Sequence, residues 1–223
     1  MVEHGTFLNP FVWGCDAWHM ARLLVSIPFC NAHDSADPVE QEHKFEAWLS
    51  DIMSSPCAGA SGSPLAAIRN LRSAGMHCWM VEKLREHAVG RYHALSRTLR
   101  DMAQTRDPSS MTRDDISELW GFGLVSASLF KAYSDPFSGV VVLDAHTLSD
   151  MGFPKPECPD DYKASEKEYL KEAFCKREHP TIMGFKMWID RKHFHGAALD
   201  EVHMSMRHAY DYLDSVDWHP SPP

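Results

Sequence analysis

The chain lacks the sequence features of secreted and membrane proteins. Among its 223 residues, no apolar run approaches the roughly 20 residues that a helix needs to cross a bilayer. The N-terminus has no basic start followed by an apolar core and a small-residue cleavage site, so it does not resemble a secretory signal. The six cysteines include no Cys-x-x-Cys pair, which argues against a zinc ribbon and against a four-cysteine iron–sulfur loop. We therefore expect an intracellular protein with reduced thiols, in the cytoplasm of a prokaryote or the nucleus of a eukaryote.

Positive charge is also scarce. The 22 Lys and Arg residues against 31 Asp and Glu give a formal net charge of −9, which argues against a protein that coats DNA indiscriminately. Residues 82–106 are an exception, because six basic residues there outnumber three acidic ones. Such a stretch is typical either of a surface that contacts a nucleic-acid backbone or of a solvated helix face.

Apolar residues recur at helical spacing along most of the chain, which predicts an all-α protein. The run 140–143 is too short to predict a sheet, and residues 54–64 and 152–161 are predicted loops because they are rich in Ser, Gly or Pro. Thr112 is the expected N-cap of one helix. The other predicted helices cover residues 11–27 (ending at Pro28), 38–53, 65–73, 76–84, 88–102, 126–133, 147–151, 163–177, 183–192 and 199–216.

The most informative stretch is Leu119-Trp-Gly-Phe-Gly-Leu-Val-Ser-Ala-Ser128, followed by Val140-Val-Val-Leu-Asp-Ala-His-Thr-Leu148. Gly121 and Gly123 can turn the chain sharply and let a ligand approach the backbone, because neither carries a Cβ atom. A helix pattern resumes at Ser126, so the amides of residues 123–125 are expected at a helix N-terminus, which binds anions such as a nucleic-acid phosphate. A carboxylate, Asp144, follows 21 residues after Gly123, at the end of an apolar run.

These two segments resemble the helix-hairpin-helix DNA glycosylase superfamily, which contains endonuclease III, the adenine-mismatch glycosylases and the 8-oxoguanine glycosylases. The family signature is Leu-x-Gly-hydrophobic-Gly-x-x-(Ser/Thr)-Ala, followed further along the chain by Val-Asp-x-His. The resemblance covers residues 114–150. The matching residues are Leu119, Gly121, Gly123, Ser126 and Ala127 in the hairpin, and Leu143, Asp144 and His146 in the second segment.

The resemblance implies two helical lobes with a cleft between them. Residues 76–150 would form the lobe with the hairpin, and residues 1–75 and 151–223 would pack together as the other lobe. Asp144 is the expected catalytic residue, because a carboxylate beside C1′ of the sugar stabilises the positive charge that builds up as the base leaves.

One departure from the family pattern bears on the mechanism. Relatives that also cut the DNA strand carry a lysine two residues after the second hairpin glycine, and this position is Val125 here. Valine cannot form a Schiff base, so the resemblance implies a monofunctional DNA N-glycosylase. Lys131 is the nearest lysine along the predicted helix, and we expect it to face solvent or phosphate.

The implied partner is double-stranded DNA with a damaged or modified base, bound by a monomer. A flipped base must be held between flat or apolar side chains, although aromatic residues at helical spacing more often belong to a core. His146 can either bond a phosphate or simply pack, and packing is the preferred interpretation. The residues expected to contact DNA are Gly121, Gly123, Leu124, Val125, Ser126, Lys131 and His146, and the candidates for the base pocket are Trp13, Trp18, Trp48, Trp79 and Trp188.

No cofactor is expected to be required. The 14 histidines lack the spacing of a helical zinc site such as His-Glu-x-x-His, so we predict no metal held by side chains. The family hairpin binds a monovalent cation through backbone carbonyls, which implies that residues 119–125 could hold Na⁺ or K⁺.

Two alternatives remain beside the enzyme. The same fold could recognise or help to process modified bases in DNA without catalysis, but Asp144 favours an enzyme, since a binding module has no need of a carboxylate near the sugar. The acidic net charge supports a helical protein unrelated to DNA. Salt-dependent binding to a duplex would separate this last alternative from the other two.

Overall fold

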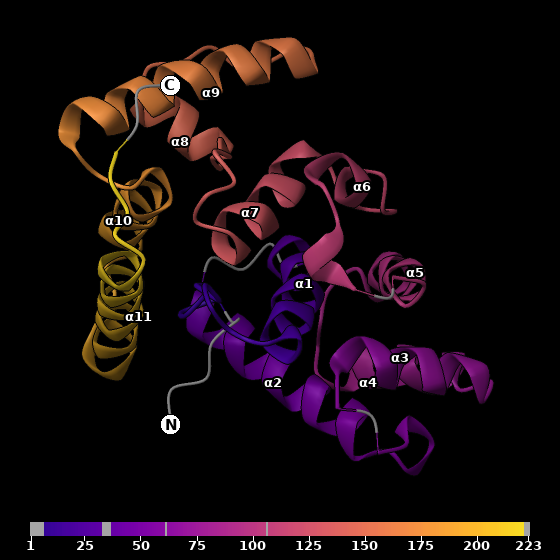
Figure 1. Ribbon diagram of the computed structural model, residues 1–223. Helices are drawn as coiled ribbons and strands as arrows, with labels where there is room; N and C mark the ends of the chain where they lie inside the picture. Colours follow the sequence, from indigo (N-terminus) through magenta and orange to yellow (C-terminus); the bar gives the residue numbers. More distant parts are fainter. Residues whose placement is uncertain (1–6, 33–36, 61, 106, 221–223) are drawn as a thin grey trace.

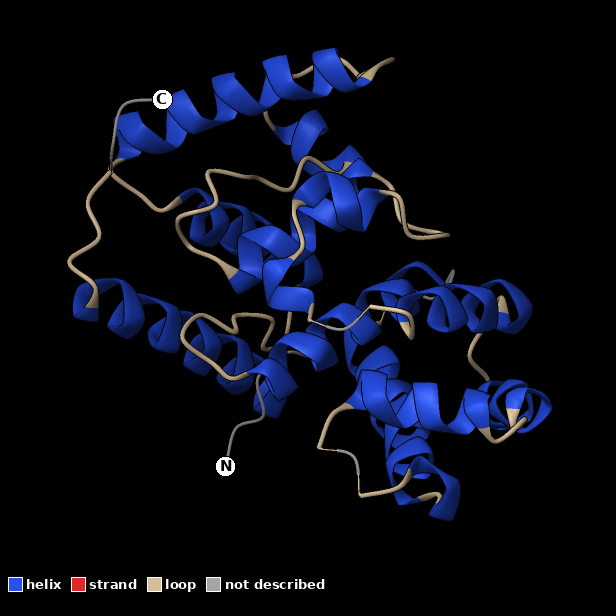
Figure 2. Cartoon of the chain, turned by 45° about the vertical axis from the view of Figure 1, so that its right-hand side comes forward, coloured by secondary structure: helices blue, strands red, loops and turns tan. Residues whose placement is uncertain are grey.

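The computed structural model describes residues 7–32, 37–60, 62–105 and 107–220. Within these ranges the regular secondary structure is entirely helical, as Figures 1 and 2 show, so the all-α prediction is confirmed. Two 3₁₀ turns, η1 (Pro56–Ala58) and η2 (Pro108–Ser110), lie in the connections. The α-helices are α1 (Ala17–Ala32), α2 (Pro38–Ser54), α3 (Pro64–Ser73), α4 (His77–Glu86), α5 (Tyr92–Met102), α6 (Arg113–Ser117), α7 (Leu124–Ser134), α8 (Ala145–Asp150), α9 (Pro159–Lys176), α10 (Pro180–Lys192) and α11 (Gly196–Ser215).

The first helix corrects one sequence prediction. The helix expected over residues 11–27 instead begins at Ala17 and continues through Pro28 to Ala32. Proline inside a helix removes one backbone hydrogen bond, but the turn that follows is held by packing. Phe29 lies against Phe45 and Trp48 of α2, with ring centroids 5.1 and 4.9 Å apart. Tertiary contacts therefore outweigh the local cost of Pro28.

Helix α5 also begins later than its pattern predicts. It starts at Tyr92 and not at residue 88, because Ala88 and Arg91 adopt left-handed backbone angles with φ of 52° and 51°. Residues in that region cannot continue a right-handed helix. The predicted cap at Thr112 is confirmed, since its side chain accepts a hydrogen bond from the Asp115 amide while the Asp115 carboxylate accepts one from the Thr112 amide.

Helix α1 lies at the centre of the fold and contacts α2, α3, α5 and α7. Figure 1 shows α10 and α11 side by side along one flank, α8 and α9 at the top, and α3 to α5 on the opposite flank. The largest hydrophobic cluster joins α1 through α5 to α6 and α7, through residues such as Trp48, Leu71 and Phe130. This cluster extends across the predicted lobe boundary at residue 75, and the division into lobes stays a prediction.

Two smaller clusters complete the core. One joins the N-terminal segment, through Leu8, Phe11 and Trp13, to α10 and α11. The other packs residues 141–148 against α9, with Tyr162 and Tyr169 at its centre. The chain ends are therefore partly packed together, and the segment that carries Asp144 has an apolar anchor of its own.

Candidate functional site

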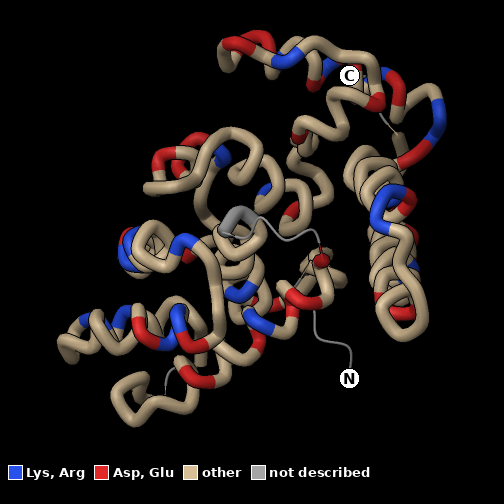
Figure 3. The backbone as a smooth tube through the Cα atoms, turned by 180° about the vertical axis from the view of Figure 1, so that it is seen from behind, with Lys and Arg blue, Asp and Glu red and all other residues tan. Residues whose placement is uncertain are grey.

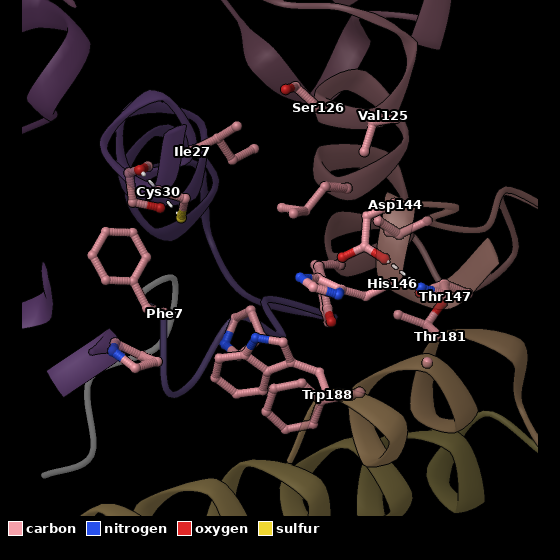
Figure 4. A pocket seen from close by; sticks show the side chains of 18 of the residues that line it. Phe7, Ile27, Cys30, Val125, Ser126, Asp144, His146, Thr147, Thr181 and Trp188 are labelled. Carbon is pink, nitrogen blue, oxygen red and sulfur yellow. Dashed lines mark hydrogen bonds between the residues drawn. The ribbon is translucent and has the colours of Figure 1, made fainter. Parts of the chain in front are cut away.

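A pocket of about 440 Å³ opens where α1, α7, α8 and α10 meet. This volume lies within the roughly 300–1,000 Å³ that is typical of small-molecule sites. Figure 4 shows Val125, Ser126, Asp144, His146 and Trp188 among its lining residues, and all five were predicted site residues. We call this cavity the Asp144 pocket. It brings the first turn of α7, directly after the two-glycine turn, to the same space as the predicted catalytic carboxylate.

Asp144 is the N-cap of α8, and its side chain is half-buried in the wall of the pocket. Its Oδ1 atom accepts a hydrogen bond of 2.6 Å from the Thr147 amide. This bond fixes the carboxylate and satisfies one of the amides that a helix N-terminus leaves without a partner. Within the described residues, Oδ2 takes part in no hydrogen bond, so one carboxylate oxygen remains for a ligand.

Helix α9 supplies the hydrogen bonds that hold the extended segment before Asp144. The Tyr162 hydroxyl accepts a bond from the Leu143 amide (3.0 Å) and donates one to the Val141 carbonyl (3.1 Å). The Glu166 carboxylate accepts a bond from the Val141 amide (3.1 Å). These side chains satisfy backbone groups that a neighbouring strand would satisfy in a sheet.

Glu166 also links this segment to α6, the helix before the two-glycine turn. Its Oε1 atom lies 2.6 Å from Nη1 of Arg113, the first residue of α6, and the two side chains are only 8% and 16% exposed. A buried ion pair offsets its desolvation cost only when further hydrogen bonds satisfy its atoms, and the bond from Val141 does this here. Through Glu166, α6 and the Asp144 segment are fixed to the same point of α9.

Two further side chains tie down the chain on either side of Asp144. The His179 Nε2–H donates to the Pro136 carbonyl (2.9 Å), and Nδ1 accepts from the Thr181 amide (3.2 Å), so the ring is neutral. Burial lowers the pKa of His179 to about 4, partly opposed by its bond to Pro136. On the other side, Arg191 of α10 donates to the His146 carbonyl and to the Asp150 carboxylate, each at 2.9 Å.

The two-glycine turn between α6 and α7 is compact. Gly121 has φ of +84°, and a Cβ atom there would lie 2.5 Å from the Thr98 hydroxyl. Gly123, by contrast, has extended backbone (φ −137°, ψ −175°) and caps α7. The turn is fixed to α5, because the Asp101 carboxylate accepts a 2.8 Å bond from the Trp120 amide. Only one of the two glycines is therefore required by backbone conformation.

The first turn of α7 faces outward beside the pocket. Its first hydrogen bond runs from the Ala127 amide to the Gly123 carbonyl (3.0 Å), so the Leu124 and Val125 amides have no partner within the helix. Of the predicted DNA contacts, Gly121, Gly123, Val125 and His146 are exposed, whereas Leu124, Ser126 and Lys131 are half-buried. Lys131 is not among the residues that line the Asp144 pocket.

Most of the tryptophans predicted for the base pocket lie elsewhere. Trp13 and Trp48 are buried in hydrophobic clusters, and the Trp13 indole donates to the Ala132 carbonyl (3.0 Å). Trp18 packs beside Arg22, Trp79 lies near Lys83, and neither lines the pocket. Trp13 and Trp48 are core residues, Trp18 and Trp79 are half-buried beside basic side chains, and of the five candidates only Trp188 lines the Asp144 pocket.

Trp188 rises from α10 into the pocket, stacked on Phe185 with ring centroids 5.3 Å apart and planes 17° from parallel. Phe7 and Ile27 form part of the opposite wall, as Figure 4 shows. A flat aromatic face across from apolar side chains suits a planar ligand. No sequence motif indicated these wall residues, because they come from segments that meet only in the folded chain.

Helices α3 to α5 carry an excess of basic over acidic residues. Residues 64–103, which form α3 to α5, contain seven Lys or Arg against three Asp or Glu, and Figure 3 shows blue segments along these helices. Arg97 of this group lies with its guanidinium 4.5 Å from the ring centroid of Trp120 in the turn. The basic region therefore adjoins the turn directly, in a protein whose net charge is −9.

Sequence reasoning did not single out Tyr162, Glu166, His179 or Arg191, which position the site. A weak signal exists for the first two, because they are one helical turn apart on a strongly charged helix and face the same side. His179 carried no signal beyond its place before Pro180, which is the first residue of a helix. The hydrogen bonds of Arg191 depend on tertiary placement alone.

Three further findings concern metal binding, membrane-spanning helices and similarity to known proteins. Nowhere in the described ranges do three or more His, Cys, Asp or Glu side chains gather closely enough to hold a metal ion. None of the helices over the described residues combines the length and the apolar composition needed to span a bilayer. The chain matches no known protein-family model, no curated protein and no solved structure.

Proposed function

We propose that this protein is a monofunctional DNA glycosylase that hydrolyses the N-glycosidic bond of a flipped damaged or modified base, in base-excision repair or in defence against modified DNA. One observation carries the proposal. Asp144 and the first turn of α7 line the same pocket, and that pocket has an aromatic wall and room for a base. A carboxylate, backbone amides for a phosphate and a flat pocket are the parts that this reaction needs.

The chemistry assigned to Asp144 follows from its surroundings. As the bond between base and sugar lengthens, positive charge builds up on the deoxyribose, and the Asp144 carboxylate stabilises it. Because Oδ1 is held by Thr147, Oδ2 is the oxygen that faces the sugar or orients the attacking water. Water then adds to C1′, and the product is an abasic site without strand cleavage.

Binding of the duplex is assigned to the turn and to its basic neighbours. The amides of Leu124 and Val125 would donate hydrogen bonds to a phosphate, and the basic side chains of α3 to α5 would contact the DNA backbone further along. These contacts do not distinguish one base sequence from another, so the altered base must be recognised by the pocket. Double-stranded DNA with an altered base is the proposed partner, bound by one protein molecule.

Val125 is the reason for proposing a monofunctional enzyme. Its side chain lines the pocket with Asp144 and is 37% exposed. An amine at this place could attack C1′, whereas an isopropyl group cannot. The abasic product is therefore expected to form without a covalent intermediate between protein and sugar.

A panel of labelled duplexes tests the proposal. Each duplex carries one uracil, 5-hydroxymethyluracil, 8-oxoguanine or 7-methylguanine, and alkali after incubation reveals abasic sites as strand breaks. We expect alkali-dependent breaks in at least one duplex and no borohydride-trapped adduct. Duplex binding at low salt with no base release from any member would favour the catalytically silent alternative, and no salt-dependent binding at all would exclude both.

A further inference from the structure

The Asp144 pocket contains few groups that can supply a proton. Among the described residues that line it, the titratable ones are Cys30, Tyr133, Asp144, His146, Tyr169 and Lys192. Burial raises the pKa of the Cys30 thiol and of the Tyr133 and Tyr169 phenols, which makes all three poor acids. Asp144 is needed as an anion, and a lysine ammonium holds its proton tightly.

His146 differs from these groups in type and in position. Histidine is the side chain whose ordinary proton exchange falls near neutral pH, where general acid catalysis is most effective. Its imidazole is exposed, and Figure 4 shows it directed into the pocket beside the Asp144 carboxylate. The preference for a packed His146, drawn from the sequence, is therefore wrong.

We propose that His146 is the general acid that protonates the departing base, so that the site is suited to neutral bases. The inference rests on the proposed glycosylase function. The C1′–N bond breaks and its electron pair goes to the base nitrogen, which takes the proton from the His146 imidazolium. The C1′–O bond forms to water, and the proton released by that water goes to Asp144.

A general acid must be held in place, and the backbone of His146 is held by Arg191. Its carbonyl accepts a bond of 2.9 Å from Arg191, which also holds Asp150 at the other end of α8. The charged groups beside His146 in the pocket wall are Asp144, the N-cap of α8, and Lys192 of α10. Asp150, at the far end of α8, acts on the imidazole electrostatically and is itself paired with Arg191. Among the described residues that line the pocket, those of α1, α2 and α7 include no carboxylate, lysine or arginine.

The test compares His146→Gln with wild type under single-turnover conditions. On a duplex that carries the neutral base released fastest by wild type, we expect the variant to lose about 100-fold or more in rate. Duplex affinity should not change. The fall in rate at high pH should disappear, because no imidazolium remains to be deprotonated. Added imidazole should restore part of the rate of His146→Ala, which opens space beside the base.

A cationic base supplies the internal comparison. 7-Methylguanine already carries the charge that its departure removes, so it leaves without a proton, and its release should change by less than about threefold in His146→Gln. His203→Gln, an exposed substitution on α11 away from the pocket, should match wild type on every duplex.

The outcomes separate this inference from the function on which it rests. Equal losses on neutral and cationic bases, or no loss at all, overturn the role of His146 and leave the glycosylase in place. Release of 7-methylguanine alone by wild type overturns it as well. If wild type releases no base from any duplex, the function falls and the general acid falls with it.

Discussion

The two segments that meet at the Asp144 pocket are held in place in different ways. The turn at residues 118–123 is built mainly from nearby residues, through the Thr112 cap of α6, the left-handed Gly121 and a bond to α5, the helix that precedes α6. The segment 135–146 has few bonds of its own and is fixed by α9 and α10. One side of the site is therefore local in origin, and the other depends on long-range polar contacts.

Because the two segments are held differently, we expect mutations to affect them differently. A local turn tolerates changes elsewhere in the molecule, because its conformation is set by its own backbone. A segment held by distant side chains loses its position when any one of them is removed. We therefore expect segment 135–146, which carries Asp144, to be more sensitive to remote substitutions than the turn is.

Asp144→Asn is expected to have the largest effect on activity. It removes the charge but keeps an N-cap acceptor for Thr147, since Asn and Asp cap helices about equally well. Base release should fall about 1,000-fold or more, with folding and duplex affinity preserved. Asp144→Ala should lose activity and also about 1 kcal/mol of stability with the cap. Full activity of Asp144→Asn would end the catalytic assignment.

Glu166→Ala tests the long-range support most strongly. It leaves Arg113 without its partner and the Val141 amide without an acceptor, so we expect a loss of about 3–5 kcal/mol in the free energy of unfolding. Urea denaturation measures this. The control is Glu168→Ala on the exposed side of α9, where the pair with Lys171 is 58% exposed at both ends and the change should stay within about 0.5 kcal/mol. Equal effects would show that the buried pair does not hold the segment.

His179 makes the same side of the site sensitive to acid. Its pKa is about 4 in the folded protein because it is buried, whereas an unfolded chain binds the proton near pH 6.5. The unfolded state therefore gains protons first, and about 3 kcal/mol of stability should be lost as the pH falls from 6.5 to 4. Below that range the contribution is constant. His179→Asn, which keeps a cap for Thr181, should remove this part of the pH dependence, whereas His203→Asn should retain it.

The contrast between local and long-range support also explains which features of the fold the sequence could predict. Apolar periodicity located most helices, and capping residues and glycines located the turn, because these signals lie within a few residues of what they specify. The continuation of α1 through Pro28 was missed because its cause is packing against α2. Trp13 and Trp48 were assigned to the pocket because aromatic spacing does not distinguish a core from a cavity.

The residues of the candidate site also divide into those that the sequence could predict and those that it could not. Asp144 and Val125 could be named because they belong to a motif with fixed spacing. Tyr162, Glu166 and Arg191 could not, because their roles exist only once α9 and α10 have packed beside the segment. The turn, which is local in structure, was thus predicted together with what holds it, whereas on the other side the motif named Asp144 but not the side chains that hold it in place.

The local origin of the turn is tested by a matched pair, Gly121→Ala and Gly123→Ala. An alanine at residue 121 must adopt φ near +84° and meet the Thr98 hydroxyl at 2.5 Å. Thr98 is only 3% exposed and its hydroxyl donates to the Ala94 carbonyl, so it cannot move away freely. We expect Gly121→Ala to lose about 2 kcal/mol of stability. The double variant with Thr98→Ala should recover the part that is due to the contact, measured as non-additivity of the two substitutions.

Gly123→Ala should change stability by no more than about 0.5 kcal/mol, because φ at residue 123 is −137° and no atom lies within 4 Å of the added methyl group. Its effect should fall on binding, since residue 123 is exposed directly before the outward amides of α7. Gly123→Val should weaken duplex binding further and to the same degree on every DNA sequence, because phosphate contacts do not distinguish bases. Binding curves that overlay wild type would reduce the turn to a structural corner. Equal destabilisation by the two alanines would show that backbone conformation does not set the turn, and the contrast between the two sides of the pocket would be lost.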